Sequence, residues 1–271
     1  MAGSPALVHL EKTQRRDAWW LEAVPVWILL GGFGIYATWR AFEGDFYTWG
    51  PYLSPFYSPL IDPQHHWWRL SPALLILGGP LSFRATCYYY RKAYYRAFFW
   101  DPPACAVSEK PGNYRGETRF PFILQNLHRY ALYLALIFIC FLWYDAIRAF
   151  SFPDSWYTIT ANFPAGHEGI GSLSISHSFG IGVGSLIMLA NVILLTLYTF
   201  SCHSLRHLIG GKLDCFSCVA AGGARHSTWK LSSYLNEHHM LFAWASLISV
   251  GATDFYIRLV ASGAIRDLRL L

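Results

Sequence analysis

Charged side chains are scarce in this sequence. Asp, Glu, Lys and Arg together make up 14% of its 271 residues, whereas about 25% is usual in a soluble domain. Hydrophobic residues account for 54% of the chain and aromatic residues for 18%, and amphipathic aromatic rings collect at the two interfaces of a bilayer. This composition excludes an ordinary soluble domain, and we expect an all-α polytopic membrane protein.

Other features are missing as well. The formal charge of +5 comes without the soluble basic face that nucleic-acid binding needs, so we interpret it as a sign of membrane topology. The N-terminal residues contain no short apolar stretch followed by a signal-peptide cleavage site. The six cysteines, most of them on the predicted cytoplasmic side, argue against a disulfide framework.

Several apolar segments are long enough to cross a bilayer at about 1.5 Å per residue. We expect five membrane-spanning helices in a single transmembrane domain, 1–271, at residues 21–42, 70–98, 127–150, 177–209 and 238–262. No Pro or Gly interrupts the second segment between Leu81 and Trp100. We therefore predict one long helix there, whose end projects into the cytoplasm.

Basic residues gather on one side of these predicted spans. They lie in the N-terminal lead, the loop between the second and third spans and the loop between the fourth and fifth, at Lys12, Arg15, Arg16, Arg91, Lys92, Arg96, Lys110, Arg115, Arg119, Arg206, Lys212, Arg225 and Lys230. The two opposite loops hold essentially none. Since cytoplasmic loops carry the excess of Lys and Arg, we expect the N-terminus in the cytoplasm and the C-terminus outside.

The stretch YTFSCHSLRHLIGGKLDCFSC, residues 198–218, combines imidazoles with thiols. His203 and His207 are four residues apart and so share one face of a helix, and Cys215 and Cys218 follow as a Cys-x-x-Cys pair. Two Cys and two His can hold a structural zinc ion, or a Rieske-type [2Fe–2S] cluster with the His pair on one iron and the Cys pair on the other. Without a metal, the thiols are small apolar fillers and the imidazoles interfacial polar groups.

The predicted topology brings more ligand-type residues to the same side of the membrane, namely Cys87, Cys105, His128, Cys202, His238 and His239. A bis-histidine haem is therefore an alternative, because it needs His side chains from two helices at similar depth. The first predicted span contains no His, so a stack of two haems is poorly supplied, while a single haem on the inner side stays open.

A second candidate site lies in the inner half of the second span. Ser82 and Arg84 precede three tyrosines, Tyr88, Tyr89 and Tyr90. A hydroxyl and a guanidinium can donate to the carbonyls of a quinone while an aromatic ring packs against it. The alternative is that Arg84 extends to lipid phosphate at the interface.

Two acidic residues fall within predicted spans. Arg258 follows Asp254 by four residues, and Arg148 follows Asp145 by three. We expect each acid to form an ion pair with the arginine on its own helix.

Four segments resemble one known family: SFRATCYYYRKAYYR, SCHSLRHLIGG, LNEHHMLFAW and TDFYIRLVASG. They are similar to the membrane anchor of succinate dehydrogenase, respiratory complex II, of the actinobacterial type that includes the mycobacterial "first" enzyme. The resemblance covers most of the chain from the first span onward.

The resemblance implies an electron-transfer subunit of a succinate:quinone oxidoreductase in the bacterial plasma membrane. A flavoprotein subunit with FAD and an iron–sulfur subunit would dock on the cytoplasmic face, and electrons would reach a quinone, usually menaquinone. The anchor would carry a membrane-embedded Rieske-type [2Fe–2S] cluster in place of haem, and this subunit alone would not oxidise succinate.

Carried onto this sequence, the cluster falls on His203, His207, Cys215 and Cys218, which we call the 203–218 set. Cys202, His238, His239 and Cys87 are substitutes for any of the four. The candidate quinone pocket comprises Ser82, Arg84, Tyr88, Tyr89 and Trp244. The alternatives are an anchor with haem b and, more distantly, a transporter or structural membrane protein with a zinc-clamped loop.

Overall fold

The computed structural model describes residues 18–61, 71–99, 120, 122–153, 177–211 and 213–271. The predicted N-terminal lead, most of the loop after the second span and most of the outer loop after the third lie outside these residues. Among the residues named above, Cys105 and Lys212 also lie outside them, as does Leu70 at the start of the second predicted span. The histidines of the two outer loops, His65, His66 and His167, lie outside them as well. Within the described residues the chain is helical, with two short antiparallel strand pairs.

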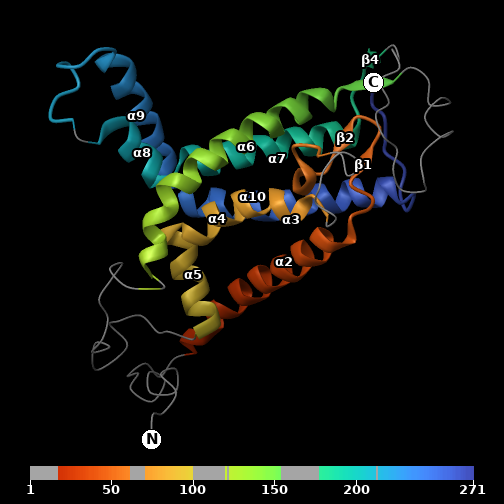
Figure 1. Cartoon of the computed structure of the whole chain (residues 1–271), viewed down its shortest axis with the longest axis horizontal. Helices are drawn as coiled ribbons and strands as arrows, with labels where there is room; N and C mark the ends of the chain where they lie inside the picture. The colour runs from red at the N-terminus through yellow and green to blue at the C-terminus, as the bar shows by residue number, and fades with distance from the viewer. Residues whose placement is uncertain (1–17, 62–70, 100–119, 121, 154–176, 212) are drawn as a thin grey trace, which may run out of the picture.

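The bundle is formed mainly by α6 (His128–Arg148), α7 (Val183–Phe200) and α10 (His239–Ala261). α7 packs against both α6 and α10, and α4 (Gly78–Thr86) packs against α6. α2 (Ala23–Glu43) diverges from this bundle, so that α5 (Tyr88–Phe99) bridges the gap between α4 and the beginning of α2 (Figure 1). η1 (Trp19–Glu22) precedes α2, and η5 (Phe122–Leu127) precedes α6.

Four helical segments are long and apolar enough to cross a membrane within the described part of the chain: Trp20–Glu43, Ile123–Arg148, Val183–Phe200 and His239–Ala261. They correspond to the first, third, fourth and fifth predicted spans. The fold is thus all-α apart from the strand pairs, as expected for a polytopic membrane protein. The total of five spans and the orientation of the termini stay predictions.

The second predicted span differs from a single long helix. It contains α3 (Ala73–Ile76), α4 and α5, with a turn at Leu77 and an extended residue, ψ 129°, at Cys87. Pro80 accounts for the first interruption, because it has no N–H to donate to the carbonyl of Ile76. The prediction of one helix up to Trp100 is therefore wrong, and α5 turns towards α2 at Cys87.

Tertiary contacts stabilise the break at Cys87. The Tyr90 hydroxyl donates to the Ala243 carbonyl of α10 at 2.6 Å, and the indole N–H of Trp244 donates to the Tyr89 hydroxyl at 2.6 Å. A continuous helix would carry both tyrosines away from α10. The local sequence has no Pro or Gly at this point, so only these long-range contacts account for the break.

The fourth predicted span also ends early. α7 stops at Phe200, Cys202 is extended with ψ 133°, and α8 (His203–Gly210) then begins a helical hairpin with α9 (Gly222–Glu237). This hairpin extends beyond one end of the bundle (Figure 1). The predicted continuation of one helix to residue 209 is therefore wrong.

The opposite end of the bundle carries the strands. β1 (Thr48–Trp49) pairs with β2 (Tyr52–Leu53), with Trp49 opposite Tyr52, and η2 (Pro55–Tyr57) follows. β3 (Ser151–Pro153) pairs with β4 (His177–Phe179). The C-terminal residues lie beside β4 at this end (Figure 1), where the Leu270 N–H donates to the Ile181 carbonyl.

A buried ion pair attaches α2 to α10 at this end. The side chains of Arg40 and Asp254 are both fully buried, and Arg40 Nε donates to Asp254 Oδ2 at 2.8 Å. Tyr36 and Ser54 also donate to this carboxylate. Arg258 pairs instead with Glu43, so the predicted Asp254–Arg258 pair is wrong.

The predicted pairing of Asp145 with Arg148 is not what the structure shows either. The Asp145 carboxylate accepts a hydrogen bond from Ser58 of the loop after α2, and Arg148 donates to the Tyr144 hydroxyl at 3.2 Å. Asp254 thus joins α10, and Asp145 joins α6, to the segment that follows α2. A carboxylate removed from water needs hydrogen-bond donors inside the protein, and these come here from distant residues.

We predict that Asp254→Asn destabilises the protein by about 3 kcal/mol, because it removes the fully buried carboxylate of the Arg40 pair and leaves only the half-buried Glu43 as an acidic partner of the guanidinium. Thermal unfolding of the detergent-purified protein would measure the loss. Arg148→Gln is the matched control, since Arg148 is exposed. Equal midpoints for Asp254→Asn and the control would contradict the importance of the pair.

Candidate functional site

Two cysteines and two histidines meet where the helices end near the α8–α9 hairpin. His128 Nε2 lies 3.1 Å from Cys202 Sγ, and His239 Nε2 lies 3.6 Å from Cys87 Sγ. Both thiols belong to the same buried cluster and are 3% and 2% exposed for Cys87 and Cys202. We call Cys87, Cys202, His128 and His239 the thiol–imidazole site.

The helix boundaries explain how these four side chains converge. Cys87 and Cys202 are the extended residues that precede α5 and α8, while His128 and His239 are the first residues of α6 and α10. Each donor therefore lies at the N-terminal end of a helix. Distant parts of the sequence supply the four, and the packing of α6 and α7 on α4 and α10 brings them together.

Hydroxyl groups fix the state of both imidazoles. The Thr86 hydroxyl donates to the Ser82 carbonyl at 2.7 Å and lies 3.0 Å from His128 Nδ1. The Ser201 hydroxyl donates to the Tyr198 carbonyl at 2.9 Å and lies 2.6 Å from His239 Nδ1. Since each hydroxyl proton is committed to a carbonyl, each oxygen accepts from an Nδ1–H.

This arrangement leaves both Nε2 atoms unprotonated and directed at a thiol. Metal-bound histidines commonly donate their other ring N–H to such an outer partner, which fixes the tautomer and the ring orientation. In this tautomer both imidazoles can bind a metal through Nε2.

Within the described residues, no three or more His, Cys, Asp or Glu side chains surround one point as a site for a single metal ion. The donors of the thiol–imidazole site come instead as two separate pairs. A two-iron cluster takes four protein ligands, and in a Rieske-type cluster two His bind one iron and two Cys bind the other. The site supplies these donor types in these numbers, although each imidazole here lies beside a thiol and not beside the other imidazole.

The 203–218 set is placed differently. His203 and His207 are exposed on α8 with their Nε2 atoms 3.0 Å apart, and partial burial together with His207 and Arg206 lowers the pKa of His203. Cys215 and Cys218 form a disulfide with each other. The structure does not gather these four side chains at one point, so their joint role as ligands stays a prediction.

The disulfide closes a short loop within the α8–α9 hairpin and connects no two distant elements. It is a local crosslink and does not form a disulfide framework. Of the predicted substitutes, His238 is exposed and packs against Tyr234 and Phe242. The other three, Cys87, Cys202 and His239, belong to the thiol–imidazole site.

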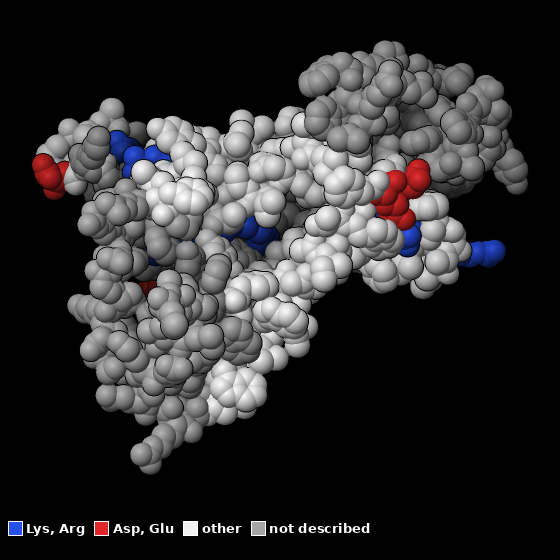
Figure 2. Space-filling model, turned by 60° about the horizontal axis from the view of Figure 1, so that its bottom comes forward, with Lys and Arg blue, Asp and Glu red and all other residues white. Residues whose placement is uncertain are grey.

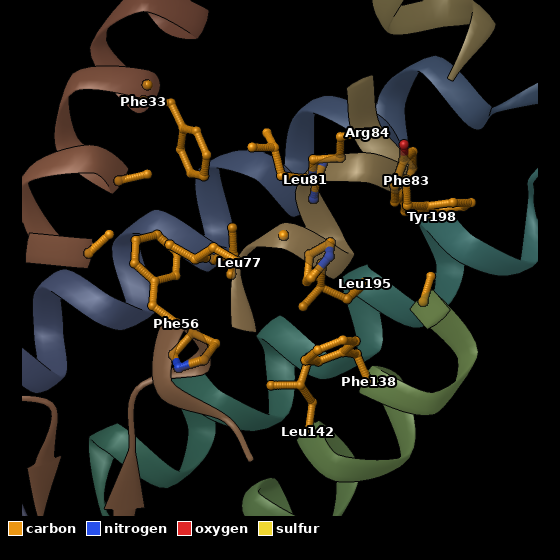
Figure 3. Close-up of a pocket in the computed structure, with 18 of the residues that line it drawn as sticks. Phe33, Phe56, Leu77, Leu81, Phe83, Arg84, Phe138, Leu142, Leu195 and Tyr198 are labelled. Atoms are coloured by element: carbon orange, nitrogen blue, oxygen red, sulfur yellow. The ribbon is translucent and has the colours of Figure 1, made fainter. Parts of the chain in front are cut away.

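A cavity of about 360 Å³ lies between α2 and the bundle. Its walls are mostly apolar and come from the middle of α2, η2, α3, α4, α6 and α7, with Phe33, Phe56, Leu77, Leu81, Phe138, Leu142 and Leu195 among them (Figure 3). Arg84, Phe83 and Tyr198 lie together at one end of it (Figure 3). In Figure 2 a hollow crosses an otherwise uncharged face, and Lys or Arg surface is visible within it.

The thiol–imidazole site adjoins this end of the cavity. The Phe83 ring stacks on His128, with centroids 4.7 Å apart, and the Tyr198 ring stacks on His239 at 5.2 Å. Both aromatic residues also line the cavity. One aromatic side chain thus separates each imidazole from the cavity.

Arg84 is held across the break at Cys87. Its Nη1 atom donates to the Tyr90 hydroxyl at 2.6 Å and to the Ala243 carbonyl at 3.2 Å, and its Nη2 atom donates to the Ser246 hydroxyl at 2.9 Å. The guanidinium also lies 4.6 Å above the Tyr198 ring. These contacts within the protein replace the alternative in which Arg84 extends to lipid phosphate.

The other predicted quinone residues do not line the described cavity. Ser82 donates to the Gly79 carbonyl at 2.6 Å, Tyr89 is engaged with Trp244, and Tyr88 is 66% exposed. Phe83 and Tyr198 could not be predicted from the sequence, because no spacing rule marks an aromatic residue as a cavity wall. The position of His128 at the start of a predicted span was a signal for the thiol–imidazole site, but its partners there were not predictable from spacing.

We predict that Cys215 and Cys218 in the purified protein resist alkylation under denaturing conditions until a reductant is added, because they are joined in a disulfide. Mass spectrometry of the peptide would show two added alkyl groups only after reduction. Cys87 and Cys202, which are unbonded thiols, serve as the control and should react before reduction. Alkylation of Cys215 and Cys218 without reductant would contradict the disulfide.

Comparison with known proteins finds one family and one solved structure that this chain resembles. The family described as "Actinobacterial succinate dehydrogenase subunit SdhC" matches residues 21–163 and 169–263. A chain of the solved structure "Mycobacterium smegmatis Sdh1 complex in the apo form" is 44% identical, with a TM-score of 0.74, over 96% of this chain and 94% of that one. No curated protein matches.

The fold is that of a multi-pass helical membrane protein with two buried thiols and two half-buried imidazoles beside an apolar cavity. The chain belongs to the actinobacterial succinate dehydrogenase membrane-subunit family. It is accordingly a membrane anchor subunit of a succinate dehydrogenase complex in the bacterial inner membrane.

Proposed function

We propose that this anchor passes electrons from a docked iron–sulfur subunit to a quinone in the membrane, by way of a [2Fe–2S] cluster held at the thiol–imidazole site. The observation that supports this most is the placement of two buried thiols and two Nε2-directed imidazoles one aromatic layer away from an apolar cavity.

The chemistry of the donor set fits a Rieske-type cluster better than the alternatives. A structural zinc ion needs its four ligands around one point, whereas these donors form two pairs. A bis-histidine haem needs the two imidazoles to face each other across a porphyrin. Here the coordinating nitrogen of His128 faces Cys202 and that of His239 faces Cys87.

When bound, a cluster with imidazole and thiolate ligands takes up and releases one electron at a raised potential. The chain's own contribution is to supply the ligands, to orient both imidazoles through Thr86 and Ser201, and to exclude water from the site. Cys87, Cys202, His128 and His239 would replace the 203–218 set as ligands, with three of the four taken from its predicted substitutes.

The cavity suits an isoprenoid quinone, such as menaquinone. Its walls are apolar over most of its length, and Arg84 is the only Lys or Arg among the described residues that line it. Three of the five guanidinium N–H groups are committed to Tyr90, Ala243 and Ser246. The remaining N–H groups can donate to a quinone oxygen and orient the head group.

The face for the soluble subunits is the end of the bundle that carries the thiol–imidazole site and the α8–α9 hairpin. Lys92, Arg206, Arg225 and Lys230 lie on α5, α8 and α9, which the basic-residue count assigns to the cytoplasm. A flavoprotein with FAD and an iron–sulfur subunit docked there would bring their cofactors towards the buried thiols.

We predict that His128→Ala combined with His239→Ala abolishes a Rieske-type paramagnetic resonance signal in the purified complex and reduces succinate:quinone activity at least about 100-fold. Succinate oxidation by a soluble dye should persist, because the double variant leaves the partner subunits intact. His203→Ala combined with His207→Ala is the matched control. If the control lost the signal and the first variant kept it, the 203–218 set would hold the cluster.

We predict that Arg84→Gln raises the KM for quinone about tenfold or more, since it removes a charged donor at the end of the cavity. Steady-state kinetics with a soluble quinone analogue would measure it, and dye-linked succinate oxidation would stay at the wild-type rate. Arg91→Gln serves for comparison, because Arg91 packs over Tyr88 outside the cavity. An unchanged KM in Arg84→Gln would remove Arg84 from the quinone site.

A further inference from the structure

Tyr198 carries a hydroxyl that the polypeptide leaves unsatisfied. Among the described residues, its oxygen and Gln125 Oε1 are the buried side-chain polar atoms without a hydrogen-bond partner. Tyr198 is 2% exposed as a whole. Burial of a hydroxyl without a partner costs roughly 1–3 kcal/mol, so a group retained in this state calls for an acceptor that the chain itself does not provide.

The Tyr198 hydroxyl is not available to a ligand in the cavity. The Tyr198 side chain lines the cavity, but its oxygen is not accessible to solvent, although the cavity is large enough to admit water. A ligand in the cavity would therefore meet the ring and the Arg84 guanidinium before it met this oxygen.

The Tyr198 side chain packs in the same buried cluster as the two thiols, Cys87 and Cys202. The Tyr198 ring stacks on His239, and Arg84 lies over the ring. These contacts fix the ring, so the hydroxyl has little freedom to find an acceptor elsewhere.

We infer that the Tyr198 hydroxyl donates a hydrogen bond to a sulfur of the [2Fe–2S] cluster, and that it is a positioning residue which raises the reduction potential. The inference rests on the proposed function, because bound thiolates and bridging sulfides are the anionic acceptors that a cluster would bring to this hydroxyl. Hydrogen bonds to sulfur help to set the potential of such a cluster. Uptake of one electron makes the sulfurs more negative, so the bond is stronger in the reduced state.

The test is a redox titration of the Rieske-type paramagnetic resonance signal in the complete purified complex. Tyr198→Phe keeps the ring against His239 and removes only the hydroxyl. We expect the signal to persist and the equilibrium constant for one-electron reduction to fall about tenfold, which is a midpoint about 59 mV lower.

Tyr57→Phe is the matched control. Tyr57 is equally buried, but its hydroxyl already donates to the Arg40 carbonyl, away from the thiol–imidazole site. The midpoint reduction potential in this control should equal that of the wild type. A midpoint in Tyr198→Phe equal to that of the wild type, with the signal intact, overturns the inference and leaves the proposed function standing.

A second variant covers the case in which Tyr198→Phe fails to assemble. Fluorotyrosine at position 198 keeps the shape of the side chain and makes its hydroxyl a stronger donor, so the midpoint should rise above that of the wild type. An unchanged midpoint in this variant also overturns the inference. A wild-type complex without a Rieske-type signal overturns the proposed function, and the inference with it.

Discussion

Arg84 provides the constraint on which the site and the cavity both depend. A guanidinium within a membrane helix is costly unless polar groups of the protein surround it, and here those groups belong to other segments. Hydrogen bonds to Tyr90, Ala243 and Ser246 connect the end of α4 with the beginning of α5 and with α10. The chain must therefore turn at Cys87, and the turn directs the Cys87 thiol into the core.

The cavity follows from the way in which α2 is attached. At one end the Arg40–Asp254 ion pair and the Glu43–Arg258 pair join α2 to α10, and near the other end α5 packs against α2. Between these attachments small residues of α2, Gly34, Ala37 and Ala41, line the cavity. The ion pairs fix one end of α2 to α10, the packing on α5 fixes the other, and the apolar surfaces left between these attachments suit a long apolar ligand.

Much of the architecture could be predicted from local sequence. Composition and the length of the apolar segments predicted the class of protein and the positions of four helices. Both are properties of the local sequence and do not depend on which distant residues meet. The two helix breaks could not be predicted, since neither Cys87 nor Cys202 follows a Pro or Gly and each break depends on distant partners. The partner of Asp254 was missed for the same reason: the spacing rule favours Arg258 on the same helix, while burial favours Arg40.

The candidate site shows the same division. Spacing drew attention to His203, His207, Cys215 and Cys218, whose proximity in sequence is local, whereas the thiol–imidazole site is assembled from four distant segments. Only Arg84 among the predicted quinone residues lines the cavity. Residue chemistry therefore indicated the end of the bundle at which thiols and imidazoles gather, but the packing of α4, α6, α7 and α10 decided which of them meet.

The four donors of the thiol–imidazole site all lie at helix boundaries. Cys87 and Cys202 immediately precede α5 and α8, and His128 and His239 begin α6 and α10. The N-terminal end of a helix carries a partial positive charge of roughly half an elementary charge, which favours a thiolate over a thiol and an anionic group over a neutral one. Cys202 is the N-cap residue of α8 and Cys87 precedes α5, so each break places a thiol at such an end. At His128 no such end is open, because η5 leads directly into α6. The two breaks, which cost regular helix, therefore give the two thiols a more positive environment than the interior of a helix would.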